Sequence, residues 1–125
     1  MTTILRAAQA PRFDLPGVTF QAGAAPSRGS AQLCVWRLTV AGGHVSDSAH
    51  RLDRDEIFMI TSGELQLAPD GPVLRAGDMA VVPAGEPIEP VNPGVEPAEV
   101  VVAIAAGFTA TMADGTSIGT PPWAK

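Results

Sequence analysis

The sequence contains few of the residues on which several large functional classes depend. Of its 125 residues only one is a cysteine, so no disulfide can form within the chain. Cys34 stands inside an apolar run, which predicts a buried thiol in a reducing compartment. Lys and Arg number eight against 13 Asp and Glu, and they are too scattered to neutralise several phosphates together. We therefore expect no binding to nucleic acid.

Long apolar runs are also missing. No segment approaches the roughly 20 apolar residues that a membrane-spanning helix needs. The first residues, MTTILRAAQA, place Arg6 where a signal peptide would need its apolar stretch. We expect a soluble, cytoplasmic protein with no membrane partner.

Two familiar catalytic signatures are absent as well. Gly42 and Gly43 are not followed by the glycine pattern and the lysine of a phosphate-binding loop. No serine stands in a nucleophile elbow, and the chain has only two histidines. A Ser-His-Asp hydrolase therefore has little support.

Glycine and proline, in contrast, are plentiful. The 13 glycines and 12 prolines follow no repeat, so they predict many tight turns between short strands. Alternate residues from Cys34 to Val40 share one apolar face, which predicts a strand with Trp36 in the core or, alternatively, as a platform for a substrate. Residues 98–106 are apolar on both faces, as in a strand covered on its outer side, for example by another subunit. The pattern predicts a single all-β domain.

The middle of the chain contains two regular spacings. Six residues separate Glu56 from Gly63, and five residues, DMAVV, separate Gly77 from Pro83. These spacings resemble the two motifs of the cupins. The first cupin motif includes His-x-His, three or four residues, Glu, six residues and Gly; the second reads Gly, five residues, Pro-x-Gly, two residues, His, three residues and Asn. The matching positions are His50, Glu56, Gly63, Gly77, Pro83, Gly85 and Asn92, whereas Leu52 and Ile88 stand where the family has its second and third His.

The resemblance implies an antiparallel β-barrel of the jelly-roll type, with strands shared across a homodimer. Residues 31–107 would form the barrel, residues 1–30 an N-terminal arm or strand, and residues 108–125 a tail that packs on the barrel.

Both ends of the chain leave alternatives open. Residues 13–20 predict one short strand broken near Pro16 and Gly17. It either pairs with a neighbouring subunit, as in the family, or packs on its own barrel. We expect Trp123 to anchor the tail to the barrel or to a partner chain, or else to cap the mouth of the pocket.

Three His and one Glu hold a divalent metal in the metal-binding cupins. Only His50 and Glu56 remain here, and the side chains of Leu52 and Ile88 have no lone pair to offer. Zinc sites and facial iron sites need at least three protein ligands, so we expect no cofactor and no stoichiometric metal. The alternative is a divalent metal held by His50 and Glu56 with help from a substrate, a buffer ion or a further carboxylate. Asp47 and Glu86 are the carboxylates considered for that role.

His50 and Glu56 also suggest acid–base chemistry of their own. If residues 53–55 connect two paired strands, Leu52 sits opposite Glu56, and His50 lies diagonally at about 7 to 8 Å. An imidazolium beside the carboxylate would then balance its charge and supply an acid and a base.

Other placements of these residues remain open. Glu56 is alternatively exposed, or held by Arg51 or Arg54. His44 would lie on the order of 20 Å from His50 along an extended strand, and is therefore a poor third ligand.

The remaining segments complete the predicted barrel. Residues 64–75 predict a hairpin, and Val81 and Val82 are expected in the core. Ile88 is expected to point into the barrel, and the prolines between residues 86 and 97 predict a rigid corner.

We interpret the chain as a protein that binds a small organic molecule in an apolar pocket lined by Trp36, Leu52, Phe58 and Ile88. The predicted activity is that of a metal-independent isomerase, cyclase or lyase in which His50 and Glu56 transfer protons. One alternative is a binding protein without catalysis. The other is a metal-dependent enzyme, such as a dioxygenase, with an atypical site.

Overall fold

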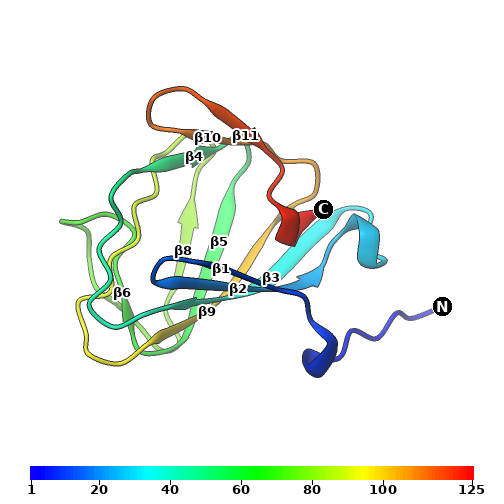
Figure 1. Ribbon diagram of the computed structural model, residues 1–125, viewed down its shortest axis with the longest axis horizontal. Coiled ribbons are helices and arrows are strands. Elements are labelled where there is room, and N and C mark those ends of the chain that lie inside the picture. The colour runs from blue at the N-terminus through cyan, green and yellow to red at the C-terminus, as the bar shows by residue number, and fades with distance from the viewer.

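The computed structural model describes residues 1–125 as two antiparallel β-sheets that enclose one core (Figure 1). The larger sheet has six strands in the order β1-β2-β3-β9-β5-β8. Its strands are β1 (Arg12–Leu15), β2 (Val18–Ala24), β3 (Leu33–Val40), β9 (Ala98–Ala105), β5 (Glu56–Ser62) and β8 (Met79–Val82). The predicted all-β jelly-roll fold is confirmed.

The second sheet is smaller and lies at the top of Figure 1. Its strands are β11 (Ser117–Gly119), β10 (Ala110–Met112) and β4 (His50–Leu52). Isolated bridges from His50 to Ile88 and from Val45 to Val91 extend it toward the 86–97 segment. This segment makes bridges without forming a regular strand, because its prolines remove backbone donors.

A separate two-stranded ribbon and three short 3-10 helices complete the chain. The ribbon pairs β6 (Glu64–Leu65) with β7 (Leu74–Arg75), as the predicted hairpin requires. The helices are η1 (Ala7–Gln9), η2 (Pro26–Arg28) and η3 (Pro122–Ala124). No helix has the length and apolar character needed to cross a membrane.

The core is formed by alternate residues of the larger sheet. In β3 the predicted apolar face from Cys34 to Val40 is buried. The register places Trp36 beside Val102 of β9, and Val102 beside Phe58 of β5. These side chains form one row across three strands, because residues two apart in a strand point to the same side.

The predicted hairpin between residues 50–52 and 56–62 is wrong. Strand β4 pairs with β10 in the smaller sheet, whereas β5 pairs with β8 and β9 in the larger one. The three-residue connection crosses between the sheets, because its carboxylates accept hydrogen bonds from other loops. Thr109 N donates to Asp53 Oδ1 at 2.7 Å, and Ala84 N donates to Asp55 Oδ1 at 2.9 Å. Leu52 and Glu56 therefore come from different sheets.

The N-terminal segment forms a hairpin instead of one broken strand. Strands β1 and β2 pair with Phe13 beside Phe20 and turn at Pro16 and Gly17. Strand β2 then pairs with β3 of the same chain, so the segment packs on its own barrel. Strand β1 is an edge of the larger sheet, and the sharing of strands between subunits stays a prediction.

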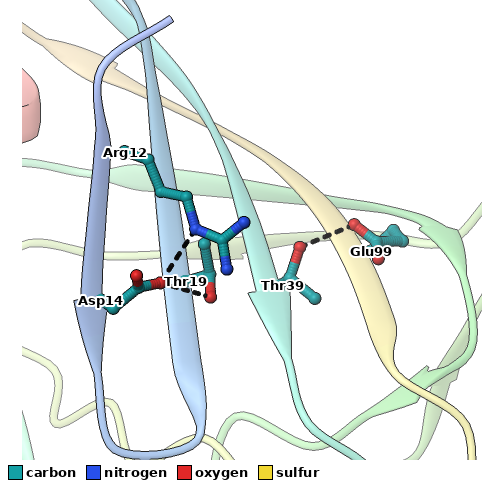
Figure 2. A network of polar contacts seen from close by, with 5 residues as sticks. All are labelled: Arg12, Asp14, Thr19, Thr39 and Glu99. Carbon is teal, nitrogen blue, oxygen red and sulfur yellow. Dashed lines mark hydrogen bonds and ion pairs between the residues drawn. The ribbon is translucent and has the colours of Figure 1, made fainter.

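The outer face of the larger sheet has a polar row and an apolar area. Thr19 Oγ1 and Arg12 Nε donate to Asp14 Oδ1 at 2.9 and 3.1 Å. In the same row, Thr39 Oγ1 donates to Glu99 Oε2 at 2.8 Å (Figure 2).

Val81 lies in the apolar area of this outer face. It is 64% exposed, whereas Val82 is buried. The expectation that both valines are in the core is therefore wrong, because neighbouring residues of β8 point to opposite faces of the sheet.

Candidate functional site

A cavity of about 650 Å³ lies between the two sheets. This volume is within the range of small-molecule sites, which are typically about 300 to 1,000 Å³. Sixteen of its 26 lining residues are hydrophobic. The residues expected to line a pocket all line this one: Trp36, Leu52, Phe58 and Ile88, together with His50 and Glu56.

Glu56 brings a carboxyl group into this apolar space. It is the first residue of β5, is 3% exposed, and pairs with Ile104 on one side and Val82 on the other. Its Oε1 atom has no hydrogen-bond partner. Because burial penalises the charged form, the pKa of Glu56 is raised to about 8. At pH 7 the side chain is therefore mainly a neutral carboxylic acid.

The two sequence-based alternatives for Glu56 are wrong. The side chain is buried, not exposed, and it forms no ion pair with Arg51 or Arg54, because the ion pairs of the chain are Arg12–Asp14 and Arg75–Glu64. Arg51 instead donates from Nη1 to Gly85 O at 3.1 Å.

His50 faces the same cavity from the opposite sheet. Its backbone is fixed by two hydrogen bonds with Ile88, N to O at 3.0 Å and O to N at 2.8 Å. Burial lowers the pKa of the half-buried imidazole, so the neutral ring is favoured at pH 7. The expected imidazolium–carboxylate pair is wrong, since His50 and Glu56 form neither a hydrogen bond nor an ion pair. Desolvation favours the uncharged form of each group.

The donor set does not fit the metal of the metal-binding cupins. Leu52 and Ile88 are buried hydrocarbon side chains in the cavity wall. No three His, Cys, Asp or Glu residues are grouped so that they could hold a metal ion. Asp47 and His44 line the cavity but do not complete such a group with His50 and Glu56. A metal-free site stays a prediction that rests on this donor set.

Other motif residues have structural roles. Gly63 has φ 77°, and a Cβ atom there would lie 2.4 Å from Pro97 O, so a larger residue is excluded twice. Asn92 is buried and donates from Nδ2 to Val40 O at 3.0 Å and to Glu96 O at 2.9 Å. Its Oδ1 accepts from Gly94 N at 2.9 Å. The chain thus retains motif residues that shape the loops, Gly63 and Asn92, whereas two metal-ligand positions of the same motifs are occupied by Leu52 and Ile88.

Sequence reasoning missed several residues of the cavity wall. Phe20 and Trp123 line it together, with their rings stacked at a centroid distance of 3.6 Å and an interplanar angle of 10°. Phe20 was missed, whereas Trp123 was expected either to anchor the tail or to cap the pocket; it attaches the tail to the barrel and also lines the cavity. Phe108, Ser46 and Ser48 are further lining residues that were missed. Phe20 and Phe108 lie far from the motifs in sequence, and Ser46 and Ser48, although they shortly precede His50, belong to no motif that marks them.

Comparison with protein families gives one match. The family model described as a cupin domain matches residues 36–104. No curated protein matches the chain significantly.

Several solved structures are similar to the chain. The polyketide cyclase RemF from Streptomyces resistomycificus aligns with a TM-score of 0.75 at 11% identity, over 98% of this chain and 89% of the cyclase. A cupin-superfamily sugar phosphate isomerase from Silicibacter pomeroyi has a TM-score of 0.68 at 23% identity, over 89% and 82%. An acetylacetone dioxygenase from Acinetobacter johnsonii has a TM-score of 0.71 at 11% identity, over 98% and 85%. At these identities the similarity establishes the fold.

Proposed function

The chain belongs to the cupin-domain family, and from that premise we propose that it binds a small organic molecule between its sheets and transfers protons on it without a metal ion. The reaction would be an isomerisation, a cyclisation or an elimination. The solved structures similar to the chain include a cyclase, an isomerase and a dioxygenase, so the fold alone does not determine which reaction is catalysed. The choice rests on the cavity.

One observation carries the proposal. Glu56 is a buried carboxyl group that lines a largely apolar cavity, and its Oε1 has no partner within the chain. An unpaired polar group in such a place costs stability. A strongly perturbed pKa in a pocket is also a recognised sign of a functional group. A bound molecule that pairs with the carboxyl group would recover the cost.

The protonation states assign the two roles. The neutral Glu56 carboxyl donates its proton to a substrate oxygen, while the neutral His50 imidazole accepts a proton from a substrate carbon. In an isomerisation this gives an enol, and the imidazolium then returns its proton to a different carbon while the Glu56 carboxylate takes back the enol proton. In an elimination the Glu56 proton leaves with a hydroxyl group as water, and the imidazolium proton then passes through solvent to the Glu56 carboxylate. Both groups thereby return to their starting protonation states in either reaction.

Proton exchange provides a test that does not require the natural substrate. We would incubate the protein in deuterium oxide with a panel of neutral aromatic and cyclic ketones, and measure deuterium incorporation beside the carbonyl by mass spectrometry. Glu56→Gln keeps the shape and removes the acid. We expect it to lower the exchange rate by about 10²- to 10⁴-fold, the usual contribution of general acid–base catalysis.

Glu99→Gln is the matched control. Glu99 is also a glutamate of the larger sheet, but it points outward and accepts a hydrogen bond from Thr39 (Figure 2). This variant should exchange at the wild-type rate. Equal rates for wild type and Glu56→Gln would contradict the mechanism. Tight binding that survives loss of both His50 and Glu56, without any exchange, would favour the alternative of a binding protein.

We also propose a homodimer in the cytoplasm. The outer face of the larger sheet exposes Leu33 of β3, Ile57 of β5, and Met79 and Val81 of β8, and apolar patches of this kind are often covered by a partner. Light scattering should give a molar mass of two chains for the wild type and of one chain for Val81→Glu. The buried free thiol of Cys34 is compatible with a reducing compartment, which cell fractionation would test.

A further inference from the structure

Trp36 is a second buried polar group of the cavity wall without a partner. The residue is 4% exposed and lines the cavity, and its Nε1 atom has no hydrogen-bond partner. Its ring is stacked with Phe108 at a centroid distance of 6.0 Å and an interplanar angle of 27°, which restricts its orientation. Buried indole N–H groups usually have an acceptor. A molecule bound in the cavity can supply the one that is missing here.

The register of the sheet brings Trp36 and Glu56 within the span of one small molecule. Trp36 lies in the same row as Phe58, two strands away, and Glu56 precedes Phe58 by two residues on the same face. With usual strand spacings, the two Cα atoms are about 12 Å apart. Both side chains are on the inner face of the sheet and line the same cavity. A ligand with two separated polar atoms can therefore pair with both.

The cavity wall is strongly enriched in aromatic rings. The chain has four Phe, two Trp and no Tyr, and all of these except Phe13 line the cavity. Aromatic side chains offer flat surfaces that stack on other flat, unsaturated groups. This composition favours a planar ligand.

The charge of the cavity wall disfavours another class of ligand. No Lys or Arg lines the cavity, whereas Asp47 does. Arg28 and Arg51 donate instead to backbone carbonyls, those of Gly23 and Gly85 among them. An anion transferred from water into an apolar site needs a cationic partner. Phosphates and carboxylates would find no Lys or Arg in this wall; its basic side chains are His44 and His50, and burial favours the neutral form of His50.

We propose that the substrate is an uncharged, planar, aromatic or conjugated molecule with two oxygen atoms, one bound to the Glu56 carboxyl group and the other to Trp36 Nε1–H. Trp36 is then a specificity-determining residue. The inference rests on the proposed function in one respect, namely that the cavity between the sheets is the substrate site. It is tested by binding alone, without turnover.

Three naphthalenes with the same ring system serve as probes for the full-length protein at pH 6.5. 6-Acetyl-2-naphthol is neutral and has two oxygens, 6-hydroxy-2-naphthoate carries a carboxylate, and 2-ethylnaphthalene has no oxygen. Dissociation constants are measured from ligand fluorescence for wild type and for Trp36→Phe. The variant removes the N–H group, and the hydrocarbon probe controls for its change in shape.

We expect the ketone to bind at least tenfold more tightly than the carboxylate. Trp36→Phe should weaken binding of the ketone by about three- to tenfold, the usual effect of one hydrogen bond, beyond any change for 2-ethylnaphthalene. A second measurement follows the wild-type protein and uses a variant only for signal assignment. The two indole N–H signals of the ¹⁵N-labelled protein are assigned with Trp123→Phe, and that of Trp36 should move downfield with the ketone but not with the hydrocarbon.

Any of three results would overturn the inference. The first is that the carboxylate binds as tightly as the ketone, and the second is that no neutral probe binds. The third is that Trp36→Phe weakens binding of the ketone and the hydrocarbon equally while the indole signal of Trp36 does not move. Failure of the proposed function is distinguishable from these. In that case the ketone binds as expected while wild type and Glu56→Gln exchange deuterium at the same rate.

Discussion

The two faces of the larger sheet treat their polar groups in opposite ways. On the outer face, in contact with water, Asp14, Thr19, Thr39 and Glu99 all form side-chain hydrogen bonds (Figure 2). On the inner face, Glu56 Oε1 and Trp36 Nε1 have no partner within the chain. Buried polar groups in folded proteins are normally paired. The difference supports the proposal that the inner face binds a small molecule, whereas the outer face is exposed to solvent or to another protein surface.

The largest expected effect comes from giving Glu56 new partners. The double variant Leu52→His/Ile88→His places imidazoles at both positions where the metal-binding cupins have them. Loss of a residue that only hydrogen-bonds to a metal ligand changes metal affinity by about 10- to 100-fold. Two added ligands should therefore raise the affinity for Co²⁺ by more than a hundredfold. Titration followed by visible absorption measures it. Adding Glu56→Gln to the double variant should weaken binding again, and an affinity equal to that of wild type would contradict the placement of these residues around one point.

The next effect concerns the pH dependence of stability. The pKa of Glu56 is raised from 4.5 to about 8 in the folded state, so between these values the folded chain retains a proton that the unfolded chain has lost. The free energy of unfolding therefore falls as the pH rises through this window, by on the order of 3 kcal/mol at pH 7. Urea unfolding of Glu56→Gln should lose this slope.

His50 provides the internal control for that experiment. The pKa of His50 is lowered in the folded state, so its contribution to the free energy of unfolding has the opposite pH dependence. This contribution is present above about pH 6.5, the usual pKa of an unfolded histidine, and is lost as the pH falls below that value. Glu56→Gln should leave this acid limb in place. A variant with the same slope as wild type above pH 5 would show that Glu56 ionises freely in the folded protein.

Removal of a buried polar group that does have partners should lower the free energy of unfolding. Asn92 is as buried as Glu56 but forms hydrogen bonds with Val40, Gly94 and Glu96. Asn92→Ala leaves these backbone groups unpaired, and we expect a loss of about 2 kcal/mol in the free energy of unfolding. Denaturant unfolding at pH 7 checks this. If Asn92→Ala were neutral, pairing would not distinguish the two buried groups.

The smallest effect is expected on the outer face. Thr39→Val removes the hydrogen bond to Glu99 at a partly exposed site, where water can replace the lost partner. The free energy of unfolding should change by less than about 0.5 kcal/mol, measured in the same urea experiment. A loss as large as that of Asn92→Ala would mean that the outer face is not solvated in the way its exposure suggests.

Much of the fold could be predicted from local sequence. Alternation in residues 33–40 identified the buried face of β3, and the spacings from Glu56 to Gly63 and from Gly77 to Pro83 identified the family. Both are local properties, since a strand alternates with a period of two and a tight turn needs its glycine wherever the strands lead. The sequence also indicated that His50 and Glu56 belong to one pocket without enough ligands for a metal.

Strand pairing and protonation were decided by the tertiary structure. Asp53 and Asp55 could have formed a hairpin turn, but their carboxylates accept hydrogen bonds from the backbone of other loops. Strands β4 and β5 therefore lie in different sheets. The charge of Glu56 depends on how much water the whole barrel removes from it, and the partner of Trp36 depends on residues from distant strands. Desolvation and long-range pairing are sums over the folded chain. The residues alone therefore determined which chemical groups are available, and only their burial together determined that they are neutral and unpaired.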